Sequence, residues 1–81
     1  IQGIIQIAVA FYHLRRGNVK GTLKLLVRGN RRLEAYLPTS AGLELTTCWQ
    51  IVTEDIALIE AGCAFDDPRL KIPTIQNNWP A

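Results

Sequence analysis

The stretch that decides the fold is residues 1–18, IQGIIQIAVAFYHLRRGN. Residues 1–14 carry no charged side chain, and apolar residues occupy most of a helix's circumference. A helix that is apolar on nearly every side is typical of a central, enclosed position. Arg15 and Arg16 suit the negative end of the helix dipole, and Gly17 suits the left-handed residue that ends a helix. We therefore predict a first helix over 1–16, enclosed by the rest of the domain.

Two further helices follow from the apolar spacing. Asn18 is placed to cap a helix over 19–36, and the short link predicts that the first two helices form an antiparallel hairpin. A third apolar stripe predicts a helix over 44–61, which Gly62 ends. Gly21 and Gly29 are unusual inside a helix, and we expect them to mark a close approach between helices. The expected core residues of the second and third helices are Val19, Leu23, Leu26, Leu33, Leu37, Leu45, Cys48, Trp49, Val52, Ile56 and Ile59.

The fold class that we predict is all-α, a three-helix antiparallel bundle with an irregular C-terminal tail. Eighty-one residues make at most one domain. The helical domain covers 1–62, with a loop over 38–42, and the proline-containing tail covers 63–81. The chain opens at Ile1 inside an apolar run without a capping residue. We therefore expect a preceding segment, which would make this the C-terminal part of a larger helical domain.

The composition limits which partners and which cellular compartment we expect for the protein. The net charge of +2 is too small to imply a nucleic-acid partner by itself. The uncharged run 1–14 is shorter than the ~20 residues that a membrane span needs, and it lacks the features of a signal peptide. Cys48 and Cys63 have no metal-finger spacing, so we expect two reduced thiols in a cytoplasmic protein, with no membrane partner.

One polar stripe interrupts the first helix. At 100° per residue, Gln2, Gln6 and His13 fall within about 40° of arc. The stripe is either a site, in which His13 binds a divalent metal or moves protons, or a hydrogen-bonded network that orients the helix. One histidine does not make a metal site, and no Glu, Asp or Cys stands three or four residues after it. Any remaining ligands must come from elsewhere.

The bases are distributed unevenly. Residues 1–33 contain seven bases and no acid, whereas all seven acids lie in 34–81. The basic residues of the second helix could contact phosphates or RNA. Alternatively, they form a solvated face whose charge is partly balanced by acids of the third helix (Glu44, Glu54, Asp55, Glu60). We favour the solvated face and do not expect nucleic acid, because no aromatic residues interleave the bases. The basic face on the second helix comprises Lys20, Lys24, Arg28, Arg31 and Arg32.

The sequence offers no catalytic constellation. Neither cysteine has a histidine nearby, and Ser40 is the only serine. No phosphate-binding glycine loop, HExxH motif or paired-carboxylate motif is present. No catalytic residue, substrate or cofactor follows from the residues, apart from the divalent metal considered for His13.

The run 2–18, followed by Gly21, the leucines at 25 and 26, Leu33-Glu34 and the later Gly42-Leu43-Glu44, resembles the domain of unknown function family 309. These are small bacterial and archaeal helical proteins without an assigned activity, and the resemblance covers about 1–62. It implies an upstream helix with a His-x-x-x-Glu motif suspected of binding metal. This chain lacks that motif, since Gly17 stands four residues after His13. The resemblance further implies that Gln2, Gln6 and His13 face that upstream part.

Three hypotheses follow, in this order. The first is a self-associating interaction or scaffold module, because three helices would leave part of so apolar a first helix uncovered. The second is a metal-binding protein or metal-dependent enzyme, with His13 as one ligand and Gln2 and Gln6 around it. The third is RNA binding through the bases of the second helix.

Overall fold

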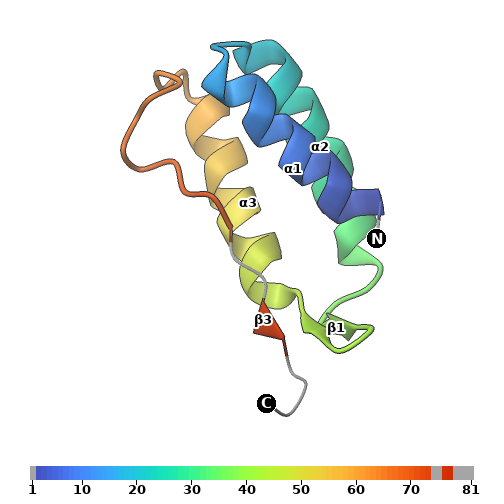
Figure 1. Cartoon of the computed structure of the whole chain (residues 1–81). Coiled ribbons are helices and arrows are strands. Elements are labelled where there is room, and N and C mark those ends of the chain that lie inside the picture. Colours follow the sequence, from blue (N-terminus) through green and yellow to red (C-terminus); the bar gives the residue numbers. More distant parts are fainter. Residues whose placement is uncertain (1, 74–75, 78–81) are drawn as a thin grey trace.

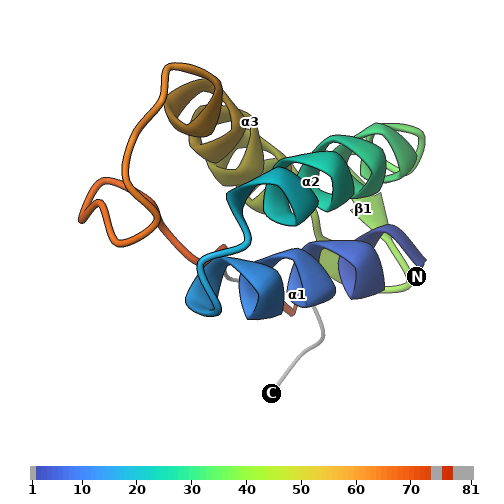
Figure 2. The same ribbon diagram turned by 90° about the horizontal axis from the view of Figure 1, so that it is seen from above.

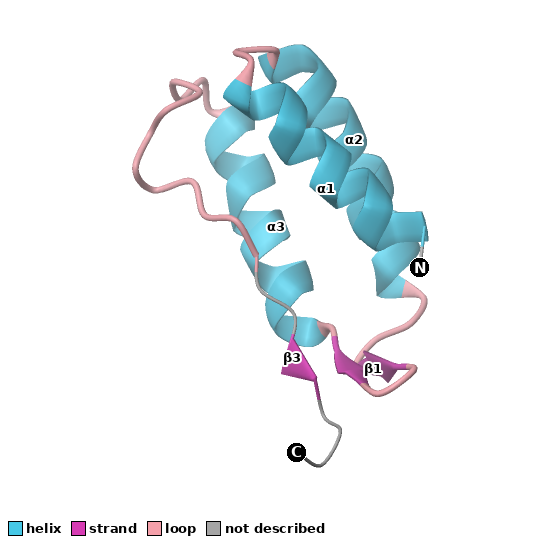
Figure 3. Cartoon of the chain, in the orientation of Figure 1, coloured by secondary structure: helices cyan, strands magenta, loops and turns pink. Residues whose placement is uncertain are grey.

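The computed structural model describes residues 2–73 and 76–77. Three helices dominate it: α1 (Gln2–Arg15), α2 (Val19–Glu34) and α3 (Thr46–Glu60). Successive helices run in opposite directions, with a small sheet at one end of the molecule (Figures 1 and 3). The prediction of an all-α three-helix bundle is confirmed, and each helix begins and ends within two residues of the position expected from the sequence.

Local chemistry ends α1 and begins α2. Gly17 has a φ of +77°, and its N–H donates to the carbonyl oxygen of Leu14 at 2.9 Å. The N–H of Asn18 donates to the carbonyl oxygen of His13 at 2.9 Å, which completes a Schellman motif. The Oδ1 atom of Asn18 then accepts the N–H of Gly21 at 3.0 Å and caps α2, as predicted. The direction change between the two helices is therefore encoded within a few residues.

A glycine pair sets how closely α1 and α2 pack. A Cβ at Gly29 would lie 2.8 Å from the carbonyl oxygen of Gly3, so the two backbones meet directly there. The expectation of a close helix approach is thus confirmed at Gly29. It is wrong at Gly21, where a Cβ would instead meet the capping side chain of Asn18. Position 21 lies in the first turn of α2, where the cap and not another helix occupies the space.

The core lies mainly between α2 and its two neighbours, and α1 is not enclosed. The exposed fractions are 61% for Ile5, 41% for Val9 and 57% for Tyr12, so the prediction of a central first helix is wrong. The reason is that α1 packs mainly against α2 while α3 lies on another side of α2 (Figure 2). The buried apolar side chains are Ile7, Ala10, Phe11, Leu14, Leu26, Leu33, Leu45, Cys48, Val52 and Ile59.

The segment predicted as a loop contains a hairpin. Strands β1 (Thr39–Ser40) and β2 (Leu43–Glu44) pair antiparallel across Ala41 and Gly42. The φ values of +51° and +79° at these two residues are those of the turn that suits a two-residue hairpin. Strand β3 (Gln76–Asn77) pairs antiparallel with β2 and is the only regular element described in the tail. Strands of two residues carry no readable alternation, so the sequence did not reveal them.

One buried carboxylate fastens the tail to α3. The side chain of Asp55 is 1% exposed, and its Oδ1 atom accepts the backbone N–H of Lys71 at 3.0 Å. Asp55 was expected among the acids that partly balance the basic face of the second helix, but its carboxylate is buried and binds the tail instead. Beyond this anchor, Ile72 and Pro73 line a hollow together with residues of α1 and Cys48 of α3. Within the described residues, no helix is long and apolar enough to cross a bilayer.

Candidate functional site

The two polar features of the sequence meet where α1 packs against α2. The Nη1 atom of Arg32 donates to Oε1 of Gln2 at 3.5 Å. Gln6, one turn further along α1, lines a hollow of about 340 Å³ together with three arginines of α2. We call this region the α1–α2 seam and define it by Gln2, Gln6, Arg28, Arg31 and Arg32.

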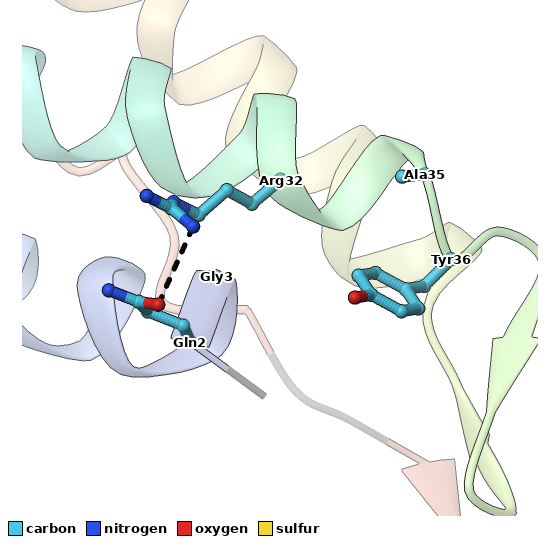
Figure 4. A pocket seen from close by; sticks show the side chains of 5 residues that line it. All are labelled: Gln2, Gly3, Arg32, Ala35 and Tyr36. Atoms are coloured by element: carbon cyan, nitrogen blue, oxygen red, sulfur yellow. Dashed lines mark hydrogen bonds between the residues drawn. The ribbon is translucent and has the colours of Figure 1, made fainter.

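A second hollow of about 360 Å³ adjoins the first through Arg32 (Figure 4). Gln2 and Arg32 point toward one another on one side of it, and the ring of Tyr36 lies on the other. The hydroxyl of Tyr36 is directed into the space between them. Gly3 and Ala35 line the remainder with little or no side chain. The hollow therefore combines an amide, a guanidinium and an aromatic ring.

The charge on the seam is not balanced by contacts. Arg28, Arg31 and Arg32 are exposed, as are the two lysines of the basic face. Within 2–73, the ion pair is that between Arg69 and Asp67, at 2.9 Å and far along the chain from α2. The expected balance by acids of the third helix therefore involves no ion pair in the described part of the chain. Three arginines therefore gather on the seam without an ion pair to a described residue, and Arg31 also lines a neighbouring hollow with Glu34 and Glu60.

Gln6 contributes an unused acceptor to the seam. Its Oε1 atom is buried, and no described residue donates a hydrogen bond to it. A buried polar atom without a partner costs about 1–3 kcal/mol. The Oε1 atom of Gln2, in contrast, accepts from Arg32. The two glutamines of the predicted stripe thus differ in what they offer.

His13 stands apart from both hollows. Its side chain is half-buried, and its ring meets the ring of Tyr12 edge-on, with centroids 5.9 Å apart. Among the described residues, no three His, Cys, Asp or Glu side chains are arranged to hold a metal ion. The structure therefore joins Gln2 and Gln6 to the arginines but does not join His13 to either hollow. Metal binding by His13 stays a prediction.

The sequence did not predict that two tyrosines lie beside arginine side chains. Tyr36 follows Arg32 by four residues, the spacing at which side chains become neighbours on a helix. Near the other end of α2, the guanidinium of Arg16 lies 5.5 Å from the ring centroid of Tyr12 and donates to its hydroxyl at 3.1 Å. An aromatic ring therefore adjoins the basic face at Arg32, and a second ring contacts Arg16, which precedes that face in the chain. The four-residue spacing before Tyr36 was the signal available in the sequence.

A second surface is apolar and faces outward from α1. Ile5, Ala8, Val9 and Tyr12 are all exposed and carry no charge. Ile5 and Tyr12 are seven residues apart, and Ala8 lies between them at the spacing of a helix-packing stripe. We call these four residues the α1 outer face.

The two cysteines differ in environment. Both are free thiols. Cys48 of α3 is buried, and burial, together with the charge of Glu44, raises the pKa of its thiol. Cys63 follows the end of α3 and is half-buried. Cys48 therefore lacks the positive surroundings that activate a thiolate.

The comparisons with known proteins bear on the first part of the chain. A family model described as "Domain of unknown function (DUF309)" matches residues 1–25, which cover α1, the turn and the start of α2. This agrees with the resemblance seen in the run 2–18. No curated protein and no solved structure matches the chain. The family description assigns no activity, so function has to be argued from the surfaces themselves.

Proposed function

We propose that this chain is a helical interaction module that associates with a second copy of itself through the α1 outer face. The observation that carries the proposal is the exposure of Ile5, Val9 and Tyr12 on one side of α1. Burying a large apolar side chain contributes roughly 1.5–3 kcal/mol. Three such side chains on one face supply a driving force for association that none of them supplies alone.

The partner is a second copy because the face is complementary to itself. A two-fold interface brings the same patch of each subunit together, so any charge on it would meet a like charge. α1 has no Lys, Arg, Asp or Glu before Arg15. The bases of the α1–α2 seam come from α2, so they do not interrupt the outer face. The guanidinium of Arg16 lies over the ring of Tyr12 near the end of α1, so two α1 helices can pack through Ile5, Ala8 and Val9 with this charge at the edge of the contact.

Sedimentation velocity over a concentration series tests this function. We expect a monomer–dimer equilibrium that shifts toward monomer in Ile5→Glu/Val9→Glu, because a carboxylate at the two-fold contact would be desolvated and repelled. The matched control is Phe65→Glu, which places a carboxylate at an exposed apolar residue outside α1. A wild-type monomer at every concentration would contradict the proposal, as would a double variant that dimerises like the wild type.

We further propose a cytoplasmic setting for this association. Two free thiols suit a reducing compartment, where disulfides are rare.

A further inference from the structure

We propose that the α1–α2 seam binds a nucleotide, with its phosphate among Arg28, Arg31 and Arg32 and its base against Tyr36. The proposal rests on two adjoining hollows that share one arginine. It does not depend on self-association, because it uses the side of α1 that carries Gln2 and Gln6 and not the α1 outer face.

The first hollow fits a phosphate group. Three guanidinium groups border it, and Arg28 is three and four residues from the other two, so the like charges repel one another on the helix surface. No described carboxylate relieves that repulsion by an ion pair. A phosphate offers up to two negative charges and several acceptor oxygens, and arginine forks match its geometry. Binding a phosphate therefore removes an unfavourable interaction and adds favourable ones.

The second hollow fits a planar base. The exposed ring of Tyr36 provides a surface on which a base stacks. The amide of Gln2 lies across the hollow from that ring and can both donate to and accept from a base edge (Figure 4). Gly3 leaves room between them because it has no side chain. Inorganic phosphate would use only the first hollow and leave this one empty.

Arg32 joins the two halves. It lines both hollows and donates to Gln2, so a ligand that engages it is adjacent to the other arginines and to Tyr36 at once. A ligand with an anionic group next to a flat, hydrogen-bonding ring satisfies each of these groups, and a nucleotide has that composition.

Calorimetric titration of the full chain with AMP, UMP, inorganic phosphate and a short single-stranded RNA tests the site. We expect the better nucleotide to bind about tenfold or more tightly than inorganic phosphate, since stacking adds to the phosphate contacts. If free nucleotides are the natural ligand, the RNA binds no more tightly than they do. If the nucleotide belongs to a strand, the RNA binds more tightly and its affinity falls more steeply with salt. Both outcomes support the seam as a nucleotide site.

Variants separate the two hollows. Arg28→Gln/Arg31→Gln should weaken binding of phosphate and nucleotide alike, by about tenfold or more. Tyr36→Ala should weaken nucleotide binding and leave phosphate binding unchanged. Arg15→Gln removes an exposed positive charge outside the seam and is the matched control for the loss of charge. All four substituted positions are exposed, so the fold should survive, and a thermal melt of each variant checks this.

A substitution that adds a negative charge gives a second test, complementary to the removal of positive charges. Gln6→Glu places a carboxylate beside the arginines, where it acts as an internal counter-ion, so ligand affinity should fall without loss of thermal stability. The proposal is overturned if neither the nucleotides nor the RNA bind, if phosphate binds as tightly as the better nucleotide, or if the arginine pair can be removed without effect.

Discussion

Gly3 and Gly29 face each other across the crossing of α1 and α2, each occupying the space that the other's side chain would need. A Cβ at Gly3 would lie 2.9 Å from the carbonyl oxygen of Gly29, and a Cβ at Gly29 would lie 2.8 Å from that of Gly3. The neighbours are backbone atoms, which cannot move aside as a flexible side chain does. This contact brings Gln2 and Gln6 within reach of the arginines of α2.

Gly29→Ala should therefore destabilise the protein. Alanine gains ~1 kcal/mol over glycine inside a helix, but overpacking at such a contact costs about 1–3 kcal/mol and forces α1 away from α2. We expect a lower unfolding temperature in a thermal melt followed by circular dichroism. Gly17→Ala is the comparison variant, because nothing lies within 4 Å of a Cβ there and its cost is that of the positive φ alone. A Gly29→Ala protein that melts above the wild type would show that the helices are not in contact here.

Asn30 should couple α2 to α3 through a hydrogen bond. Its side chain is 7% exposed, and its Nδ2 atom donates to Oγ1 of Thr53 at 3.0 Å. We expect Asn30→Ala to lower the free energy of unfolding by about 1–3 kcal/mol. In a double-mutant cycle with Thr53→Val, measured by urea denaturation, the coupling energy should be about 0.5 kcal/mol or more. Fully additive effects of the two substitutions would exclude this interaction.

The buried carboxylate of Asp55 should make stability depend on pH. Burial raises its pKa above the ordinary value of 3.8, as does the charge of Glu54, while the N–H and ammonium groups of Lys71 oppose that rise. The folded protein thus holds the Asp55 proton more tightly than the unfolded chain. The contribution of Asp55 to stability therefore falls as pH increases from about 4 through the raised pKa, and is level above it.

Urea denaturation at several pH values tests this dependence with Asp55→Asn. Asparagine keeps an oxygen for the N–H of Lys71 and removes the charge, so the fall in stability across that window should be smaller than in the wild type. Glu60→Gln, an exposed change on the same helix, is the matched control. Parallel pH profiles for the wild type and Asp55→Asn would contradict the assignment.

The two cysteines should react at very different rates with a thiol reagent. Cys48 is 1% exposed and burial raises the pKa of its thiol, so little thiolate is accessible in the folded state. We expect one fast equivalent from Cys63 and a second only on unfolding, measured with Ellman's reagent. Cys63→Ser should abolish the fast phase. A fast phase that persists in that variant would mean that Cys48 is exposed in solution.

Part of the candidate site was readable before the structure. Helical spacing put Gln2 and Gln6 on one side of α1, and the arginines of α2 stood out as a block of charge. The contact between these glutamines and arginines could not be predicted from the sequence, because it depends on how closely and in which register α1 and α2 cross. The separation of His13 from the hollows was hidden for the same reason, since an angle around a helix says nothing about position along its partner.

The order of elements follows from interactions within a few residues. Gly17, Asn18 and Gly62 end or begin helices through their own backbone and side-chain chemistry, and the leucine spacing of α2 marks its buried side. The tertiary structure decided which side of α1 stays open, because a helix that is apolar all round has no preferred face until its neighbours are placed. It also decided the partner of the buried Asp55, whose carboxylate accepts the N–H of Lys71 from the returning tail.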